Sequence, residues 1–115
     1  MRRGEVWWAD LEPRSGSEQR GRRPVLVVSH DAFNQTQAWL SVIVVPISTS
    51  ARQALRGPTS VPVGGGLPGL AVGSVGLCHQ VTTLDRRKLT RCLGAVSAQD
   101  LDAIHAGLKV AMNLP

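Results

Sequence analysis

A short polar stretch, residues 16–24, carries side chains that could act on a phosphodiester. It reads Gly-Ser-Glu-Gln-Arg-Gly-Arg-Arg-Pro and holds one carboxylate, one amide and three guanidinium groups. Guanidinium groups suit phosphate oxygens because their donors form a planar fork, and a nearby carboxylate can move a proton. Pro24 biases Arg23 toward an extended conformation as the chain enters an apolar run. We therefore expect the fold to hold Arg23 in place, and Glu18 and Gln19 to lie on a mobile arm.

Two hydroxyl side chains, Ser48 and Thr49, follow a second apolar run. Hydroxyls just past the end of a strand often serve only turn chemistry. Taken together with the arginine-rich loop, either hydroxyl could donate a hydrogen bond to a phosphate held opposite Arg23. Which of the two does so stays open.

Other motifs carry less weight. The glycines of Gly64–Gly69 match G-x-G-x-x-G, but Pro68 sits where a helix should run, so we expect a glycine-rich loop and no dinucleotide site. The three histidines lack metal-ligand spacing. Cys78 and His79 would point to opposite faces of a strand, which argues against a Cys–His nucleophile. We expect Cys78 and Cys92 to be reduced, at least partly buried thiols.

The charge balance favours an anionic partner. Lys and Arg number 13 against 8 acidic residues, giving a formal charge of +5 and a pI near 10.6, and nucleic acid is the first candidate. A basic turn formed by residues 86–88 and Arg91 could join the loop 14–23 in a track for a nucleic-acid backbone. Trp7 and Trp8 alternate on one strand, so at least one is core, and the other could stack on a base or cover an interface.

Length and patterning predict a single domain, residues 1–115, built mainly of short antiparallel strands. We expect a helical turn or loop at 31–38, and strands at 5–11, 24–29, 39–45, 59–63, 70–77, 78–83 and 91–96. Pro46 should end the third strand, and Pro62 marks an edge strand. No stretch reaches the roughly 20 apolar residues of a membrane span, so we expect a cytoplasmic protein without membrane contact.

A closing helix is predicted after residue 97. Ser97 is its expected N-cap, and Asp100 is the expected acid of a capping box. Its apolar face should contain Leu101, Ile104, Leu108 and Met112. The fold class is therefore mainly β with α: a small antiparallel β-barrel with a C-terminal helix.

Four ordered segments resemble the MazF/PemK family of toxin endoribonucleases. Residues 3–13 look like its opening R-G-[DE]-[IV]-[WY]-x-[AV]-[DN]-[LF]-x-P, and residues 16–24 look like its G-S-E-Q-x-G-x-R-P signature. Residues 44–48 resemble V-x-P-[IL]-T, with Ser48 in place of the usual threonine. Residues 80–89 resemble Q-[IV]-x-[TS]-[IL]-D-x-x-R-L, with Lys88 before the leucine. The resemblance covers nearly the whole chain.

The resemblance implies a PemK/CcdB-like, SH3-like barrel that forms a homodimer in a bacterial cell. It implies the toxin of a type II toxin–antitoxin system, which cleaves single-stranded RNA (mRNA) at short motifs without a metal or other cofactor. It also implies a cognate MazE/PemI-like antitoxin, with operator DNA bound only by the toxin–antitoxin complex.

Site roles follow from the chemistry of RNA cleavage, in which the 2′-hydroxyl is the nucleophile. Arg23 is expected to stabilise the phosphorane, with Ser48 or Thr49 as hydrogen-bond donor. Glu18 is a candidate base or a residue that orders the loop. The expected RNA-binding residues are Gln19, Arg22 and Gln80, where the two amides could read base edges. The products would carry 2′,3′-cyclic phosphate and 5′-hydroxyl ends.

Three alternatives stay open. The first is a toxin of the same barrel type that binds a topoisomerase and cleaves nothing. The second is a basic barrel that binds nucleic acid without catalysis. The third is a degenerate family member that survives as an antitoxin-binding decoy, which the departure at Ser48 keeps open. RNA cleavage by the pure protein would separate the first two from a nuclease, and a growth test on induced expression would judge the third.

Overall fold

The computed structural model describes residues 1–12, 21–50 and 57–115. Seven antiparallel strands form one curved sheet in the order β4-β5-β3-β2-β1-β7, and β6 pairs with β3 beside β5. The strands are β1 (Glu5–Asp10), β2 (Arg22–Val27), β3 (Ser41–Ser48), β4 (Ser60–Pro62), β5 (Val75–Leu77), β6 (Thr82–Asp85) and β7 (Leu89–Ala95). Among the described residues β7 pairs with β1 alone, so the small barrel stays open.

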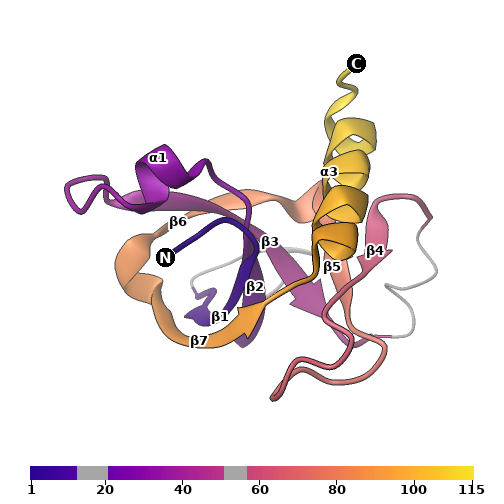
Figure 1. Cartoon of the computed structure of the whole chain (residues 1–115), viewed down its shortest axis with the longest axis horizontal. Helices are drawn as coiled ribbons and strands as arrows, with labels where there is room; N and C mark the ends of the chain where they lie inside the picture. The colour runs from indigo at the N-terminus through magenta and orange to yellow at the C-terminus, as the bar shows by residue number, and fades with distance from the viewer. Residues whose placement is uncertain (13–20, 51–56) are drawn as a thin grey trace.

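In the described part of the chain, four helical segments connect or close the strands. They are α1 (Asp31–Asn34), the 3-10 turns η1 (Cys78–Gln80) and η2 (Arg86–Lys88), and the C-terminal helix α3 (Ala98–Met112). The helix α3 stands beside β4 and η1, and α1 lies at the opposite end of the molecule from it (Figure 1). The architecture confirms the expected mainly β fold with a C-terminal helix.

The apolar runs of β2 and β3 are continuous because both faces of these strands are buried. One face packs inside the barrel with Ala9, Leu11, Val25, Val27, Val42, Val44, Leu84 and Leu89. The other face meets α3 and η1 through Val6, Leu26, Val45, Ile47, Val61, Val63, Cys78 and Ile104. Successive residues of a strand point to opposite faces, so a run such as Val25–Val27 contributes to both clusters.

Several predicted boundaries were wrong. β2 begins at Arg22 instead of Pro24, and β3 continues through Pro46 to Ser48. Pro46 pairs with Val25 of β2 and falls between the part of β3 that pairs with β6 and the part that pairs with β5. A missing backbone N–H costs least at such a change of partner. Residues 70–74 and 78–80 are not strands, because the first are turns and the second form η1.

The predicted edge strand and the predicted glycine loop are confirmed. β4 pairs with β5 only, and residues 64–69 form turns. Gly64 has φ +76°, which strains any side chain, and a Cβ there would lie 2.0 Å from Leu70 Cδ2 and displace that side chain, so the position favours glycine.

The predicted helix start is confirmed in part. Ser97 is the N-cap, and its hydroxyl oxygen accepts the backbone N–H of Asp100 at 3.0 Å. The Asp100 carboxylate does not complete a capping box; it accepts the Gly64 N–H at 2.9 Å and so ties the glycine loop to α3. Ile104 is fully buried, but Met112 is 47% exposed and lies outside the core face.

The two thiols differ in environment. Cys78 is buried under α3, where burial raises its pKa to about 11. Cys92 lies exposed on β7, so the expectation that both are partly buried was wrong for Cys92. Both cysteines are free, and His79 beside Cys78 is exposed.

Candidate functional site

A small cleft collects the residues that the sequence marked for phosphate chemistry. It has a volume of about 170 Å³ and is lined by Trp8, Arg22, Arg23, Pro24, Ile47, Thr49 and the loop residues Gly69, Leu70 and Ala71. We call it the Arg23 cleft. It brings β1, β2 and the end of β3 together with the loop that precedes β5, four segments that are far apart in sequence.

Arg23 is held where a strand leaves the core. It is exposed and lies opposite Ala9 of β1, while the next residue, Pro24, is buried opposite Trp8. The following residues of β2 are fully buried, and Val25 pairs with Pro46 of β3. The backbone that carries the guanidinium is therefore fixed by pairing with β1, and from Val25 onward β2 is also paired with β3. The frame holds Arg23, as the sequence predicted.

The two candidate hydroxyls have different environments. Thr49 is exposed and lines the Arg23 cleft. Ser48 is the last residue of β3 and 5% exposed, and its oxygen accepts the N–H of Ser50 at 3.1 Å. That contact is the strand-end turn chemistry considered above. It uses a lone pair of Ser48, so the hydroxyl proton can still be donated.

The remaining predicted residues are distributed unevenly. Arg22 is exposed and lines the cleft. Gln80 lies half-buried in η1 and is not among the residues that line the Arg23 cleft. Glu18 and Gln19 lie outside the described residues. Sequence reasoning missed the apolar wall formed by residues 69–71, because nothing in its pattern places that loop beside β2.

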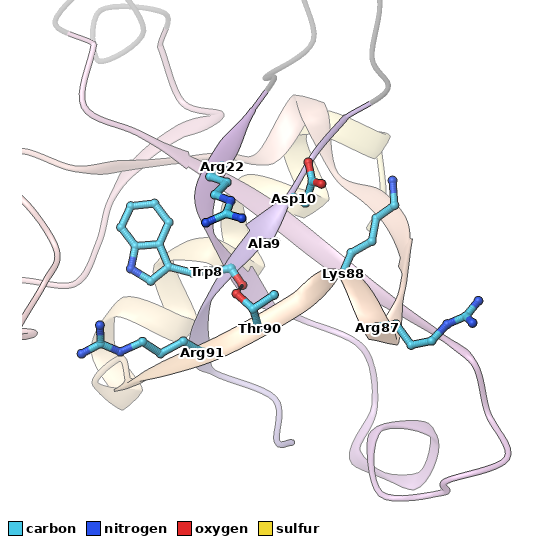
Figure 2. A pocket seen from close by; sticks show the side chains of 8 residues that line it. All are labelled: Trp8, Ala9, Asp10, Arg22, Arg87, Lys88, Thr90 and Arg91. Carbon is cyan, nitrogen blue, oxygen red and sulfur yellow. Dashed lines mark hydrogen bonds between the residues drawn. The ribbon is translucent and has the colours of Figure 1, made fainter.

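A larger basic cleft adjoins the first. Its volume is about 680 Å³, and it is lined by Trp8, Ala9, Asp10, Arg22, Arg87, Lys88, Thr90 and Arg91 (Figure 2). We call it the basic cleft. It holds four basic side chains and one carboxylate, so Arg87, Lys88 and Arg91 do join Arg22, the one residue of the predicted loop 14–23 that lines this cleft among those described. The two clefts share Trp8 and Arg22.

Within the basic turn, the neighbouring residues Arg86 and Arg87 make different contacts. Arg86 does not line the basic cleft; its guanidinium donates to four backbone carbonyls of residues 33–39. Arg87 donates to both carboxylate oxygens of Asp85 at 3.0 Å, and this lowers the pKa of Asp85 to about 2. The prediction of a single basic track was therefore wrong for Arg86.

The described residues contain no cluster of three or more His, Cys, Asp or Glu side chains that could hold a metal ion. In the same part of the chain, no helix is both long enough and apolar enough to cross a membrane. The side chains that line the two clefts include guanidinium groups, one ammonium group, hydroxyls, one carboxylate and an indole.

Comparison with known proteins gives the class of this fold and site. Residues 2–112 match the family described as PemK-like, MazF-like toxin of type II toxin–antitoxin systems. The chain is 34% identical to endoribonuclease MazF9 of Mycobacterium tuberculosis, covering 99% of this chain and 98% of that protein. It is 32% identical to endoribonuclease EndoA of Bacillus subtilis, covering 99% and 96%.

Solved structures give the same result. The fold matches MazF from Deinococcus radiodurans with a TM-score of 0.82 and 26% identity, covering 99% of this chain and 97% of that one. It matches a mycobacterial endoribonuclease solved in complex with its cognate antitoxin with a TM-score of 0.78 and 30% identity, covering 100% and 97%. This chain belongs to the PemK-like, MazF-like toxin family.

Proposed function

We propose that this protein is the toxin of a type II toxin–antitoxin system and a metal-independent, sequence-specific endoribonuclease that cleaves single-stranded mRNA. The observation that carries the proposal is that Arg23, fixed at the end of a largely buried strand, lines the same cleft as Thr49. The relatives named endoribonucleases, matched along nearly their full length, support the same reaction.

The chemistry needs little beyond positioned donors. The RNA 2′-hydroxyl attacks the adjacent phosphorus, the 2′-oxygen–phosphorus bond forms, and the bond to the 5′-oxygen breaks. The nucleophile loses its proton and the leaving oxygen gains one, which leaves 2′,3′-cyclic phosphate and 5′-hydroxyl ends. Arg23 stabilises the charge of the phosphorane, and a hydroxyl of Ser48 or Thr49 donates to the same phosphate. Glu18 is the candidate base.

RNA contacts extend around this centre. Arg22 attracts the backbone, and the amides of Gln19 and Gln80 read base edges. Gln80 would act from η1, outside the Arg23 cleft, so its role requires the RNA to pass that turn.

The partners follow from the family. We propose a cognate antitoxin, because a relative's structure holds its own cognate antitoxin, and a homodimer acting in the cytoplasm. Operator DNA would be bound only by the toxin–antitoxin complex.

The test is cleavage of single-stranded RNA by the pure protein in excess chelator, with the ends mapped. Arg23→Ala should lose about 100- to 1,000-fold in rate. The matched control is Arg2→Ala, since Arg2 is exposed and it is its backbone N–H, not its guanidinium, that donates to Glu5. Full activity of Arg23→Ala would refute the role of Arg23, and cleavage restored only by metal would refute the metal-independent reaction.

Separate removal of the two hydroxyls distinguishes them. If Thr49 is the donor, Thr49→Val loses activity while Ser48→Ala stays near the wild-type rate. If Ser48 is the donor, the order reverses. Retention of activity by both variants would show that neither hydroxyl donates to the phosphate.

A further inference from the structure

The basic cleft adjoins the Arg23 cleft through two shared residues, Trp8 and Arg22. A strand of RNA bound at Arg23 therefore has a continuous basic surface onto which it can extend. The larger cleft has about four times the volume of the smaller, 680 against 170 Å³. Its size fits further nucleotides better than a single phosphate.

Only part of the charge in the basic cleft is available to a ligand. Arg87 is engaged by Asp85 and points away from the other lining residues in Figure 2. Lys88 donates its Nζ proton to the carbonyl oxygen of Glu12. Arg22 and Arg91 are exposed, and neither has a side-chain hydrogen bond or ion pair to a described residue. These two guanidinium groups are therefore the ones that can bind phosphates.

Trp8 lies between the two arginines. It is half-buried in β1, opposite Pro24 on β2 and opposite Arg91 on β7. Its carbonyl oxygen accepts the hydroxyl of Thr90 at 3.3 Å, which adds a tie to β7. A half-buried indole with a fixed backbone loses little entropy when a base stacks on it, and every base has a face to stack.

We propose that the basic cleft binds nucleotides flanking the cleavage site on the same RNA strand. A base stacks on Trp8, and Arg22 and Arg91 hold the neighbouring phosphates. Asp10, which lies on the other side of Arg22 from Trp8 in Figure 2, can accept a hydrogen bond from a base amino group. This inference rests on the proposed endoribonuclease function, and it assigns Trp8 and Arg91 a role in binding substrate.

RNA accounts for the cleft better than an acidic peptide does. The cleft combines an aromatic face with separated cations, which matches the alternation of base and phosphate along a single strand. It also contains the Asp10 carboxylate, which can accept a hydrogen bond from a base amino group, whereas an acidic side chain offers it no such donor. Continuity with the Arg23 cleft adds a reason specific to a strand that is cut there.

The experiment compares a short RNA holding the cut site with the same RNA extended by four nucleotides on either side. Binding is measured with a 2′-deoxy residue at the cut site, which removes the nucleophile, and cleavage is measured with the all-ribose strands. The wild type should bind the extended RNA about tenfold more tightly. The quantity compared between variants is this ratio of extended to short.

Arg91→Ala should reduce the ratio several-fold and should lower the salt dependence of binding by about 0.7 in log–log slope, the value for one phosphate contact on a single strand. Trp8→Ala should reduce it by a similar factor, and Trp8→Phe should keep most of it because a ring remains. An extension without bases keeps the phosphate contacts but cannot stack. It should therefore lower the ratio of extended to short RNA binding in the wild type and in Trp8→Phe alike. Lys109→Ala, an exposed charge on α3, is the matched control and should leave the ratio unchanged.

The inference is overturned if Arg91→Ala keeps the wild-type ratio and the abasic extension also leaves the ratio of Trp8→Phe unchanged. These two measurements decide it even where Trp8→Ala fails to fold. It is also overturned if a glutamate-rich peptide binds in an Arg91-dependent manner while the RNA extension does not. A wild-type protein that cleaves no RNA would refute the proposed function itself. Cleavage without any effect of extension would refute only the flanking site.

Discussion

Arg86 and Arg87 are adjacent basic residues whose removal should have unequal effects on stability. In Arg86 the Nε donates to the carbonyl of Trp39 at 3.0 Å, and Nη1 donates to that of Asn34 at 2.7 Å. Its Nη2 donates to the carbonyls of Phe33 and Thr36 at 3.1 and 3.3 Å. The side chain thus fastens the segment between α1 and β3 to η2.

The size of the effect follows from these contacts. A hydrogen bond from a charged donor contributes about 1.5–3 kcal/mol when well shielded, and here only the bond to Asn34 is partly buried. The other three are solvent-exposed and add a few tenths of a kcal/mol each at most. Arg86→Ala should therefore lower the free energy of unfolding by about 2–3 kcal/mol, which is roughly 10 °C in Tm for a chain of this length.

The neighbouring substitution is the control. Arg87 is 86% exposed and pairs with a carboxylate at the surface, and exposed ion pairs contribute little. Arg87→Ala removes the same charge, so its smaller effect would separate hydrogen bonding from net charge. Arg86→Lys should not restore stability, because one ammonium group cannot reach four carbonyls spread around a planar fork.

The assay is equilibrium urea unfolding of the three variants, with hydrogen exchange followed across residues 30–40. In Arg86→Ala the amides of this segment should exchange faster, while those of β2 should change only by the global loss of stability. Equal destabilisation by Arg86→Ala and Arg87→Ala would refute the reasoning. So would unchanged exchange in the segment.

Two further outcomes are expected. Iodoacetamide at pH 8 should alkylate Cys92 alone in the native protein, because Cys78 is buried and its pKa is raised to about 11; mass spectrometry showing equal labelling of both would contradict this. Asp31 accepts the backbone N–H of Arg3 at 2.6 Å and the amide of Asn34 at 3.0 Å, and these bonds lower its pKa below the ordinary 3.8. The ionised Asp31 carboxylate therefore adds to the free energy of unfolding above pH 3.8, and this contribution is lost as the pH falls through the lowered pKa of the folded state. In urea unfolding, the stability difference between wild type and Asp31→Asn should be largest at pH 7 and should shrink toward pH 3. A difference independent of pH would count against it.

Much of the frame could be predicted from local sequence. The first strand, the edge strand at Pro62 and the cap at Ser97 each depend on neighbours in the chain, and the structure confirms them. The errors fall where tertiary pairing decides. Pro46 continues a strand because two different partners meet beside it, and residues 70–74 are drawn into turns by positive-φ glycines such as Gly73.

The part of the site that short sequence motifs contain could be predicted. The arginine at the start of β2 and the hydroxyls after Ile47 were marked by residue type, and Arg23 and Thr49 do share a cleft. The wall at residues 69–71 and the position of Trp8 between two clefts were not predictable. Both depend on which strands become neighbours, and sequence spacing does not contain that information. The roles of Glu18 and Gln19 stay predictions.

The same pairings explain why adjacent residues with the same charge differ in role. Successive residues of a strand face opposite sides, so a slip of one residue in β2 would put one of the two arginines at the position of the other. The register is locked by Val25–Val27, which are fully buried between two apolar clusters. A slip would move each of these side chains into the wrong cluster. Core packing therefore determines which arginine lies opposite Ala9 and which lies opposite Asp10, and the geometry of the candidate site depends on residues that never touch RNA.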